Sequence, residues 1–86
     1  MGMDFAELVM EVEERVGIEI PNEIAATLTT VGKLNAWVMG ELHRLDRPLP
    51  AEDGFEQIRG IVSKLRGIKP AAILPESRFV EDLRAD

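Results

Sequence analysis

The feature that most constrains this sequence is the spacing of its apolar residues, which recur at helical intervals in separate stretches of the chain. The spacing is clearest near the start and in the second half, in the sets Leu8, Val9, Val12 and Val16, and Phe55, Ile58, Ile61, Val62 and Leu65. Such spacing gathers apolar side chains on one side of a helix. The chain has no cysteine, so no disulfide can hold the helices together. We therefore predict an all-α single domain held by one small apolar core.

Capping residues indicate where the first three helices begin and end. The first is predicted over residues 3–16, where Gly17 provides the stop. A short second helix is predicted over 22–27, opened by a proline and an asparagine. Thr30 is the expected cap of the third, which runs through Leu42 with a partly buried Trp37 at its edge.

The second half contains a linker, a helix and a long loop. Residues 43–54 hold two prolines, a glycine and several charges, and they include the only histidine, which we expect to be a solvated linker residue. A fourth helix is predicted over residues 54–65, capped by Asp53. Residues 68–79 are predicted to form a loop in which Ile73 and Leu74 plug the core, and residues 79–83 to add a helical turn.

The charge of the chain is concentrated in its first half. The net charge is −6, and residues 1–42 hold eight acids and two bases, whereas residues 43–86 hold eight of each. This balance argues against a nucleic-acid partner, whose phosphates would be repelled, and it suits a partner with a basic surface. No apolar run approaches the ~20 residues that span a bilayer, and the first residues are acidic where a secretory signal is basic. We expect a cytoplasmic protein with no membrane contact.

Two parts of the sequence resemble the acyl carrier protein family, in the opposite order. Residues 55–86 resemble its first half, through the phrases FEQIRGIV, IKPAAILPES and FVEDLRAD. Residues 3–38 resemble its second half, through ELVMEVEE, GIEIPNE and LTTVG. The resemblance implies a four-helix carrier bundle in circularly permuted order within one domain, 1–86. Family helices II, III and IV would occupy 1–42, a linker 43–54, and helix I with the long loop 55–86.

The resemblance also implies that the attachment serine is missing. In the family, the phosphopantetheine arm is carried by the serine of an Asp-Ser-Leu triplet. Across the break, Asp86 takes the aspartate position, Met3 the leucine position and Gly2 the serine position. The only serines, Ser63 and Ser77, match other positions of the family pattern. We therefore expect no phosphopantetheine on this chain. Neither a metal nor enzymatic activity is expected, because no metal-ligand cluster and no nucleophile–base pair is visible in the sequence.

The first helix matches the segment with which carriers of the family dock on their partner enzymes. The resemblance implies four docking acids and two apolar docking residues: Asp4, Glu7, Glu13, Glu14, Met3 and Met10. The implied partner is a basic surface on a carrier-dependent enzyme of fatty acid or polyketide biosynthesis. Without the resemblance, the same acids would be interpreted as an ordinary solvated helix face.

Other interpretations stay open at this point. The chain could be a fragment or variant of a true acyl carrier whose serine lies outside it, or a structural permutant without activity. It could be a monomer, or a homodimer that swaps halves through the linker. The family's core can also open into an acyl cavity, for which the candidate lining residues are Leu8, Val12, Ile58, Val62 and Ile73. We favour a closed core over such a cavity.

Overall fold

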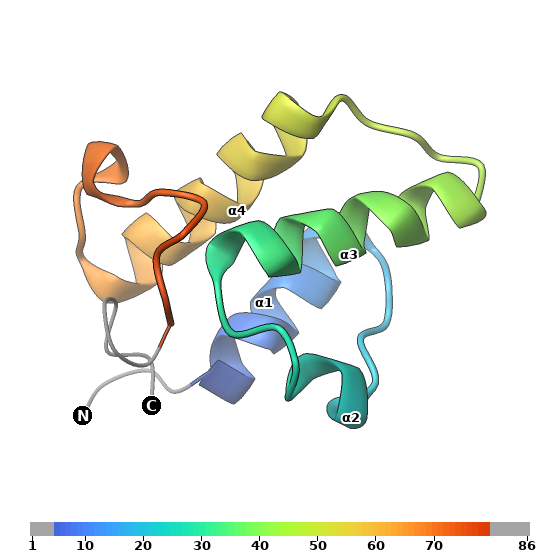
Figure 1. Ribbon diagram of the computed structural model, residues 1–86, viewed down its shortest axis with the longest axis horizontal. Helices are drawn as coiled ribbons and strands as arrows, with labels where there is room; N and C mark the ends of the chain where they lie inside the picture. Colours follow the sequence, from blue (N-terminus) through green and yellow to red (C-terminus); the bar gives the residue numbers. More distant parts are fainter. Residues whose placement is uncertain (1–4, 80–86) are drawn as a thin grey trace.

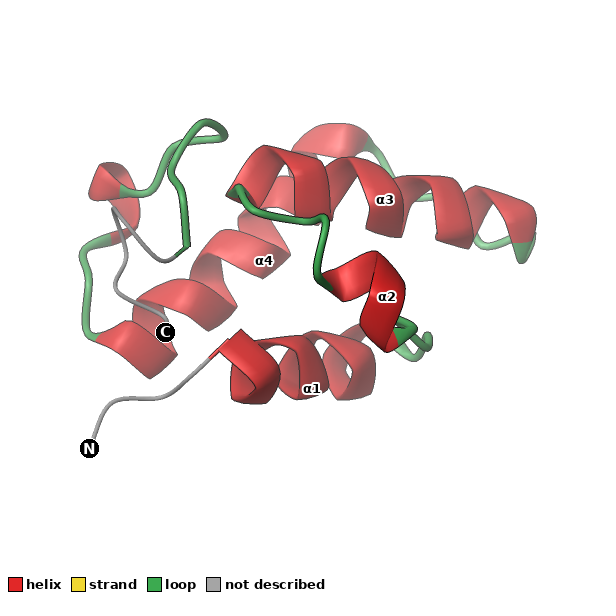
Figure 2. Ribbon diagram, turned by 60° about the horizontal axis from the view of Figure 1, so that its bottom comes forward, coloured by secondary structure: helices red, strands yellow, loops and turns green. Residues whose placement is uncertain are grey.

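The computed structural model describes residues 5–79, in which three long helices and one short helix follow one another along the chain (Figure 1). The helices are α1 (Phe5–Val16), α2 (Asn22–Ala25), α3 (Val31–Arg44) and α4 (Ala51–Arg66), and a single 3₁₀ turn, η1 (Pro70–Ala72), comes after them. Within residues 5–79 the only extended pairing is an isolated bridge between Thr30 and Arg78, and Figure 2 accordingly shows helices and loops. The predicted all-α class is confirmed. None of the described helices is long and apolar enough to cross a membrane.

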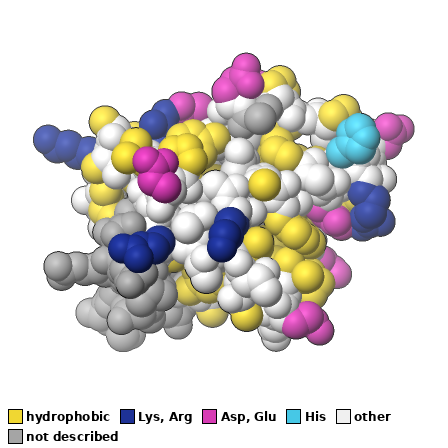
Figure 3. Space-filling model, in the orientation of Figure 1, with side chains coloured by type: hydrophobic (Ala, Val, Ile, Leu, Met, Phe, Trp, Pro, Cys, Tyr) yellow, Lys and Arg dark blue, Asp and Glu magenta, His cyan; other side chains and the backbone are white. Residues whose placement is uncertain are grey.

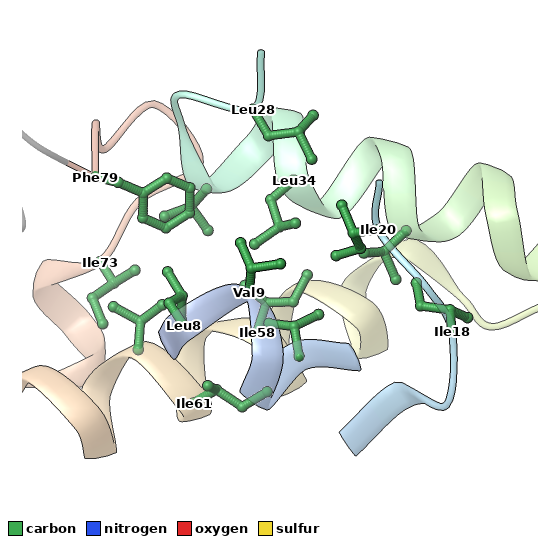
Figure 4. Close-up of a cluster of buried hydrophobic side chains, with 14 of the residues drawn as sticks. Leu8, Val9, Ile18, Ile20, Leu28, Leu34, Ile58, Ile61, Ile73 and Phe79 are labelled. Carbon is green, nitrogen blue, oxygen red and sulfur yellow. The ribbon is translucent and has the colours of Figure 1, made fainter. Parts of the chain in front are cut away.

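The long helices share one apolar core. Helix α4 packs against α3, α1 and the η1 turn, and Figure 4 shows side chains from α1, α3, α4 and the loops meeting between them. The predicted helix faces account for much of this core, through Leu8, Val9, Val12, Leu34, Val38, Leu42, Ile58, Ile61 and Val62, all of which are buried. Val16, Trp37, Phe55 and Leu65 pack against it and are partly buried. The apolar periodicity therefore identified the core correctly.

Helix α3 begins at the predicted cap. Thr30 has extended backbone angles, and its Oγ1 accepts a hydrogen bond from the Lys33 backbone N–H at 3.1 Å. The first N–H groups of a helix have no partner within the helix, so such a cap stabilises its start. The helix continues to Arg44, slightly beyond the predicted end at Leu42.

The long loop after α4 is held against the start of α3. The Val31 N–H donates to the Ser77 carbonyl at 3.0 Å, and the Gly32 N–H donates to the Pro75 carbonyl at 2.7 Å. Within the loop, the Leu74 N–H donates to the Ser77 Oγ at 2.9 Å. The first two bonds satisfy N–H donors in the first turn of α3 and hold the loop against that helix, and the third is internal to the loop.

The start of α4 differs from the prediction. The helix begins at Ala51, with Pro50 at the cap position, and Asp53 lies inside the first turn without acting as a cap. The Pro50 carbonyl accepts hydrogen bonds from the N–H groups of Asp53 and Gly54, both at 3.0 Å. Proline is compatible with the start of a helix because of its fixed φ. The acids of the first turn, Glu52 and Asp53, interact favourably with the positive end of the helix dipole. The connection between α3 and α4 is therefore residues 45–50, shorter than the predicted linker 43–54.

Three other predictions are corrected by the structure. Helix α2 ends at Ala25 rather than at residue 27, because the Thr27 N–H donates to the carbonyl three residues back, that of Ile24, and not to the fourth as in an α-helix. The Thr27 hydroxyl donates to the same Ile24 carbonyl. Leu74 is 47% exposed, whereas Ile73 is fully buried, because successive side chains of an extended segment point to opposite sides. His43 is exposed in the last turn of α3 and does not belong to the connection. The predicted helical turn at 79–83 lies outside the described residues, apart from Phe79, which is buried.

Candidate functional site

The outward side of α1 carries an acidic and apolar stripe. Glu7, Met10 and Glu14 are exposed, and their spacing of three and four residues puts them on one side of the helix. Met10 is 58% exposed, the highest value among the large apolar side chains described as exposed. The opposite side of α1 buries Leu8 and Val12 in the core. We call Glu7, Met10 and Glu14 the α1 stripe (Figure 2 shows α1 along one side of the molecule).

Two further acids of α1, Glu11 and Glu13, have partners within the molecule. Glu11 is partly exposed and pairs with Arg15 at 3.6 Å. Glu13, a predicted docking acid, is half-buried, and its Oε2 accepts a hydrogen bond from the Ile20 backbone N–H at 2.7 Å. The structure therefore brings Glu7, Met10 and Glu14 together on the surface, and it places Glu13 beside the loop that follows α1.

Part of the predicted site lies outside the described residues. Asp4 and Met3, predicted to take part in docking, and Gly2, which occupies the position of the attachment serine in the resemblance, all precede residue 5. Their predicted roles remain predictions.

Two neighbouring hollows lie beside the α1 stripe, between α1, α2 and the loop that joins them. One has a volume of about 390 Å³ and is lined mainly by apolar side chains of α1 and α2, among them Phe5, Val9 and Ala25. The other, about 570 Å³, is lined by the end of α1 and the loop. Met10, Glu13, Ile20 and Asn22 line both hollows. The five residues proposed above as cavity lining have at most 1% exposure, belong to the core cluster and border neither hollow.

Both serines have hydrogen bonds within the fold. The Ser63 hydroxyl donates to the Ile68 carbonyl at 2.5 Å and ties the end of α4 to the residue after its αL stop at Gly67. Ser77 is 7% exposed, and its Oγ accepts from the Leu74 N–H. Each hydroxyl therefore has a structural partner, and neither stands at the start of a helix as an exposed nucleophile.

The charges elsewhere are mixed. On the face seen in Figure 3, acidic and basic side chains are interspersed with apolar ones, so this face shows no broad region of one sign.

On α3, the Arg44 guanidinium donates to the carboxylate of Glu41, and this hydrogen bond holds the pKa of the Glu41 carboxyl below its ordinary value. Within residues 5–79, no three acidic or histidine side chains come together in a group that could hold a metal ion.

No protein-family model matches the chain, and no solved structure matches it at a significant level. Function must therefore be inferred from the residues and surfaces of the chain itself.

One contact of the site was missed by the sequence reasoning. Arg47, in the connection between α3 and α4, was counted as a linker charge, but its guanidinium donates to the backbone carbonyls of Val16 and Gly17, at 2.9 and 3.2 Å. It thereby satisfies carbonyls at the end of α1. Spacing could not have revealed this contact, because the residues are far apart in the chain.

Proposed function

We propose that this chain is an acyl-carrier-protein-like domain in circularly permuted order that carries no phosphopantetheine and that uses α1 to dock on carrier-recognising enzymes. The observation that supports docking best is the α1 stripe. It offers Met10 between two acids, Glu7 and Glu14, on a helix whose other side is fixed in the core. The acids are seven residues apart, which is about 10 Å along the helix axis. The fitting partner surface has two basic groups at that separation and an apolar recess between them.

The absence of the arm follows from the chemistry of attachment. The transferase must join the arm to a side-chain hydroxyl that it can reach, and in the resemblance the attachment position is Gly2, which has no side chain. The hydroxyls of Ser63 and Ser77 are engaged in the fold. To modify either one, the transferase would have to break its hydrogen bond and, at Ser77, expose a buried residue.

Binding through the α1 stripe would be weak and rapid. An exposed ion pair contributes about 0.2–1 kcal/mol, so two such pairs with Met10 give modest affinity. The acidic first half of the chain would attract a basic partner over longer distances and raise the association rate. Salt shortens the range of this attraction, so the association rate is expected to fall as ionic strength rises.

A phosphopantetheinyl transferase of broad specificity tests both parts of the proposal. Intact mass after incubation with the transferase and coenzyme A should be unchanged in the folded chain. A mass gain of one phosphopantetheine would refute the claim that no arm is carried, and peptide mapping would then locate the modified residue.

The same transferase serves as the docking probe. Its association with the chain should be measured at low and at physiological salt, for wild type, Glu14→Gln and Met10→Ala. Glu76→Gln is the matched control, since it removes one exposed charge that lies outside α1 and borders neither of the two hollows. We expect both α1 variants to bind more weakly than the control. Equal losses in Glu14→Gln and Glu76→Gln would mean that only net charge matters. A folded wild-type chain that does not bind at all would refute docking and favour a structural permutant without activity.

A further inference from the structure

The two adjacent acids near the end of α1 have different surroundings. Glu14 is exposed, whereas Glu13 is half-buried and accepts the Ile20 N–H at 2.7 Å through Oε2. Ile20 itself is 4% exposed and belongs to the core. A carboxylate that accepts a backbone N–H in partly buried surroundings makes a stronger hydrogen bond than a neutral group would.

Glu13 also holds the turn that ends α1. Its backbone carbonyl accepts from the N–H of Gly17 at 2.8 Å and from that of Ile18 at 3.2 Å. Gly17 has φ +79, so the helix ends in the left-handed conformation that is usual for this pattern. The backbone carbonyl of Glu13 thus holds the first residues of the loop, and the side-chain carboxylate of Glu13 holds Ile20 further along.

The path of this loop shapes the surface beside the α1 stripe. Ile18 and Ile20 are buried and Glu19 between them is exposed, so the loop follows α1 with alternate side chains in the core. It then leads through Pro21 into α2, and Glu13 borders both hollows between α1 and α2. If the bond from Ile20 to Glu13 were lost, this part of the loop would lose its backbone hydrogen bond to α1, beside the hollows that Met10 also borders.

We propose that Glu13 is a positioning residue and not a docking acid: its carboxylate holds loop 17–21 against α1, so that the surface beside the α1 stripe keeps its shape. This inference rests on the proposed docking function. It gives different roles to two of the docking acids that the resemblance implied. Glu14 meets the basic partner, and Glu13 acts through the backbone of Ile20.

Three variants separate the two roles. Glu13→Gln removes the charge but keeps an oxygen that can accept the Ile20 N–H, whereas Glu13→Ala removes both. Glu14→Gln removes the neighbouring charge and no loop bond. For each variant, hydrogen exchange of the Ile20 amide reports on the loop, and the association rate with the phosphopantetheinyl transferase at low salt reports on docking.

The two neighbouring acids are expected to affect different measurements. In Glu13→Ala the Ile20 amide should exchange roughly tenfold faster, because a hydrogen bond to a charged acceptor is lost. Glu13→Gln should restore most of the protection and associate nearly as fast as wild type. Glu14→Gln should leave exchange unchanged and associate more slowly.

Two results would overturn the assignment. If Glu13→Gln slows association as much as Glu14→Gln does, Glu13 is a docking acid. If Glu13→Ala leaves exchange of the Ile20 amide unchanged, the carboxylate does not hold the loop. A wild-type chain that fails to associate would refute the proposed docking function instead, and the exchange measurements would still decide whether Glu13 holds the loop.

Discussion

Replacing Gly32 by alanine should destabilise this protein, although alanine is the better helix former. Gly32 lies in the first turn of α3, where its N–H donates to the Pro75 carbonyl at 2.7 Å. A Cβ on Gly32 would lie 2.8 Å from that same carbonyl oxygen and 3.4 Å from the Pro75 carbonyl carbon and Cβ. Backbone atoms cannot rotate aside as a side chain can, so the loop or the helix must shift.

The change in the free energy of unfolding is set by two costs, overpacking and a lost hydrogen bond, against one gain, in helix propensity. Overpacking of this kind costs about 1–3 kcal/mol, and a shift that breaks the hydrogen bond costs about 0.5–1.5 kcal/mol. The shift relieves the overpacking, so the two costs do not add in full. The gain in helix propensity is at most about 1 kcal/mol in a helix interior and is smaller in a first turn. We therefore expect a net loss of about 1–2 kcal/mol in the free energy of unfolding, which corresponds to a fall in Tm of roughly 5–15 °C for a domain of this size.

Gly40→Ala is the matched control because it makes the same change in the same helix. No atom lies within 4 Å of a Cβ at Gly40, and the residue is exposed. Only the propensity term acts there, so this variant should be stabilised by about 0.5–1 kcal/mol. Urea unfolding followed by helical circular dichroism measures both. If Gly32→Ala proves as stable as Gly40→Ala, the loop is not held against the start of α3, and the packing described for residues 75–77 is wrong.

Three further predictions concern other parts of the fold. Ser77→Ala should lower the free energy of unfolding by about 1–3 kcal/mol, since a partly buried loop N–H loses its acceptor; an unchanged urea midpoint would contradict this. The hydrogen bond from Arg44 lowers the folded-state pKa of Glu41 below its ordinary value of 4.5, so its stabilisation is present above that value and is lost as pH falls through the lowered pKa. Wild type should therefore lose slightly more stability on acidification than Glu41→Gln does, and equal acid titrations would argue against the pair. Separate peptides 1–47 and 48–86 should each be unfolded and become helical when mixed, because the core draws on both; a helical fold of either alone by circular dichroism would contradict this.

The local patterns of the sequence predicted much of the fold. Helical spacing identified the core faces of α1, α3 and α4, and the Thr30 cap was confirmed by its bond to Lys33. The start of α4 was missed because aspartate is a common capping residue, so Asp53 was taken as the cap. The helix instead begins after Pro50, which makes no side-chain hydrogen bond to it. Leu74 was misplaced because an apolar pair in a loop does not reveal which of its members points inward.

The candidate site was predicted less completely, because its arrangement depends on contacts between distant residues. The resemblance to the carrier family put Glu13 and Glu14 in one class, as docking acids. Their surroundings differ because loop 17–21 returns along α1 and brings the Ile20 N–H to the carboxylate of Glu13. Helical periodicity predicts the direction in which a side chain points. It does not predict which residue of a following loop will contact that side chain.

The connection between α3 and α4 shows the same dependence, and it bears on the proposed order of the halves. A connection of six residues, 45–50, can span about 20 Å when extended, which is ample for two packed helices. Length alone would be enough if the connection only joined the halves. Yet Arg47 donates to two carbonyls at the end of α1. A cation at this end also interacts favourably with the negative end of the helix dipole. The connection therefore stabilises α1 as well as linking α3 to α4. If the chain is a permuted carrier, this contact belongs to the present order of the halves, because residue 47 lies in the segment that exists only when α4 follows α3.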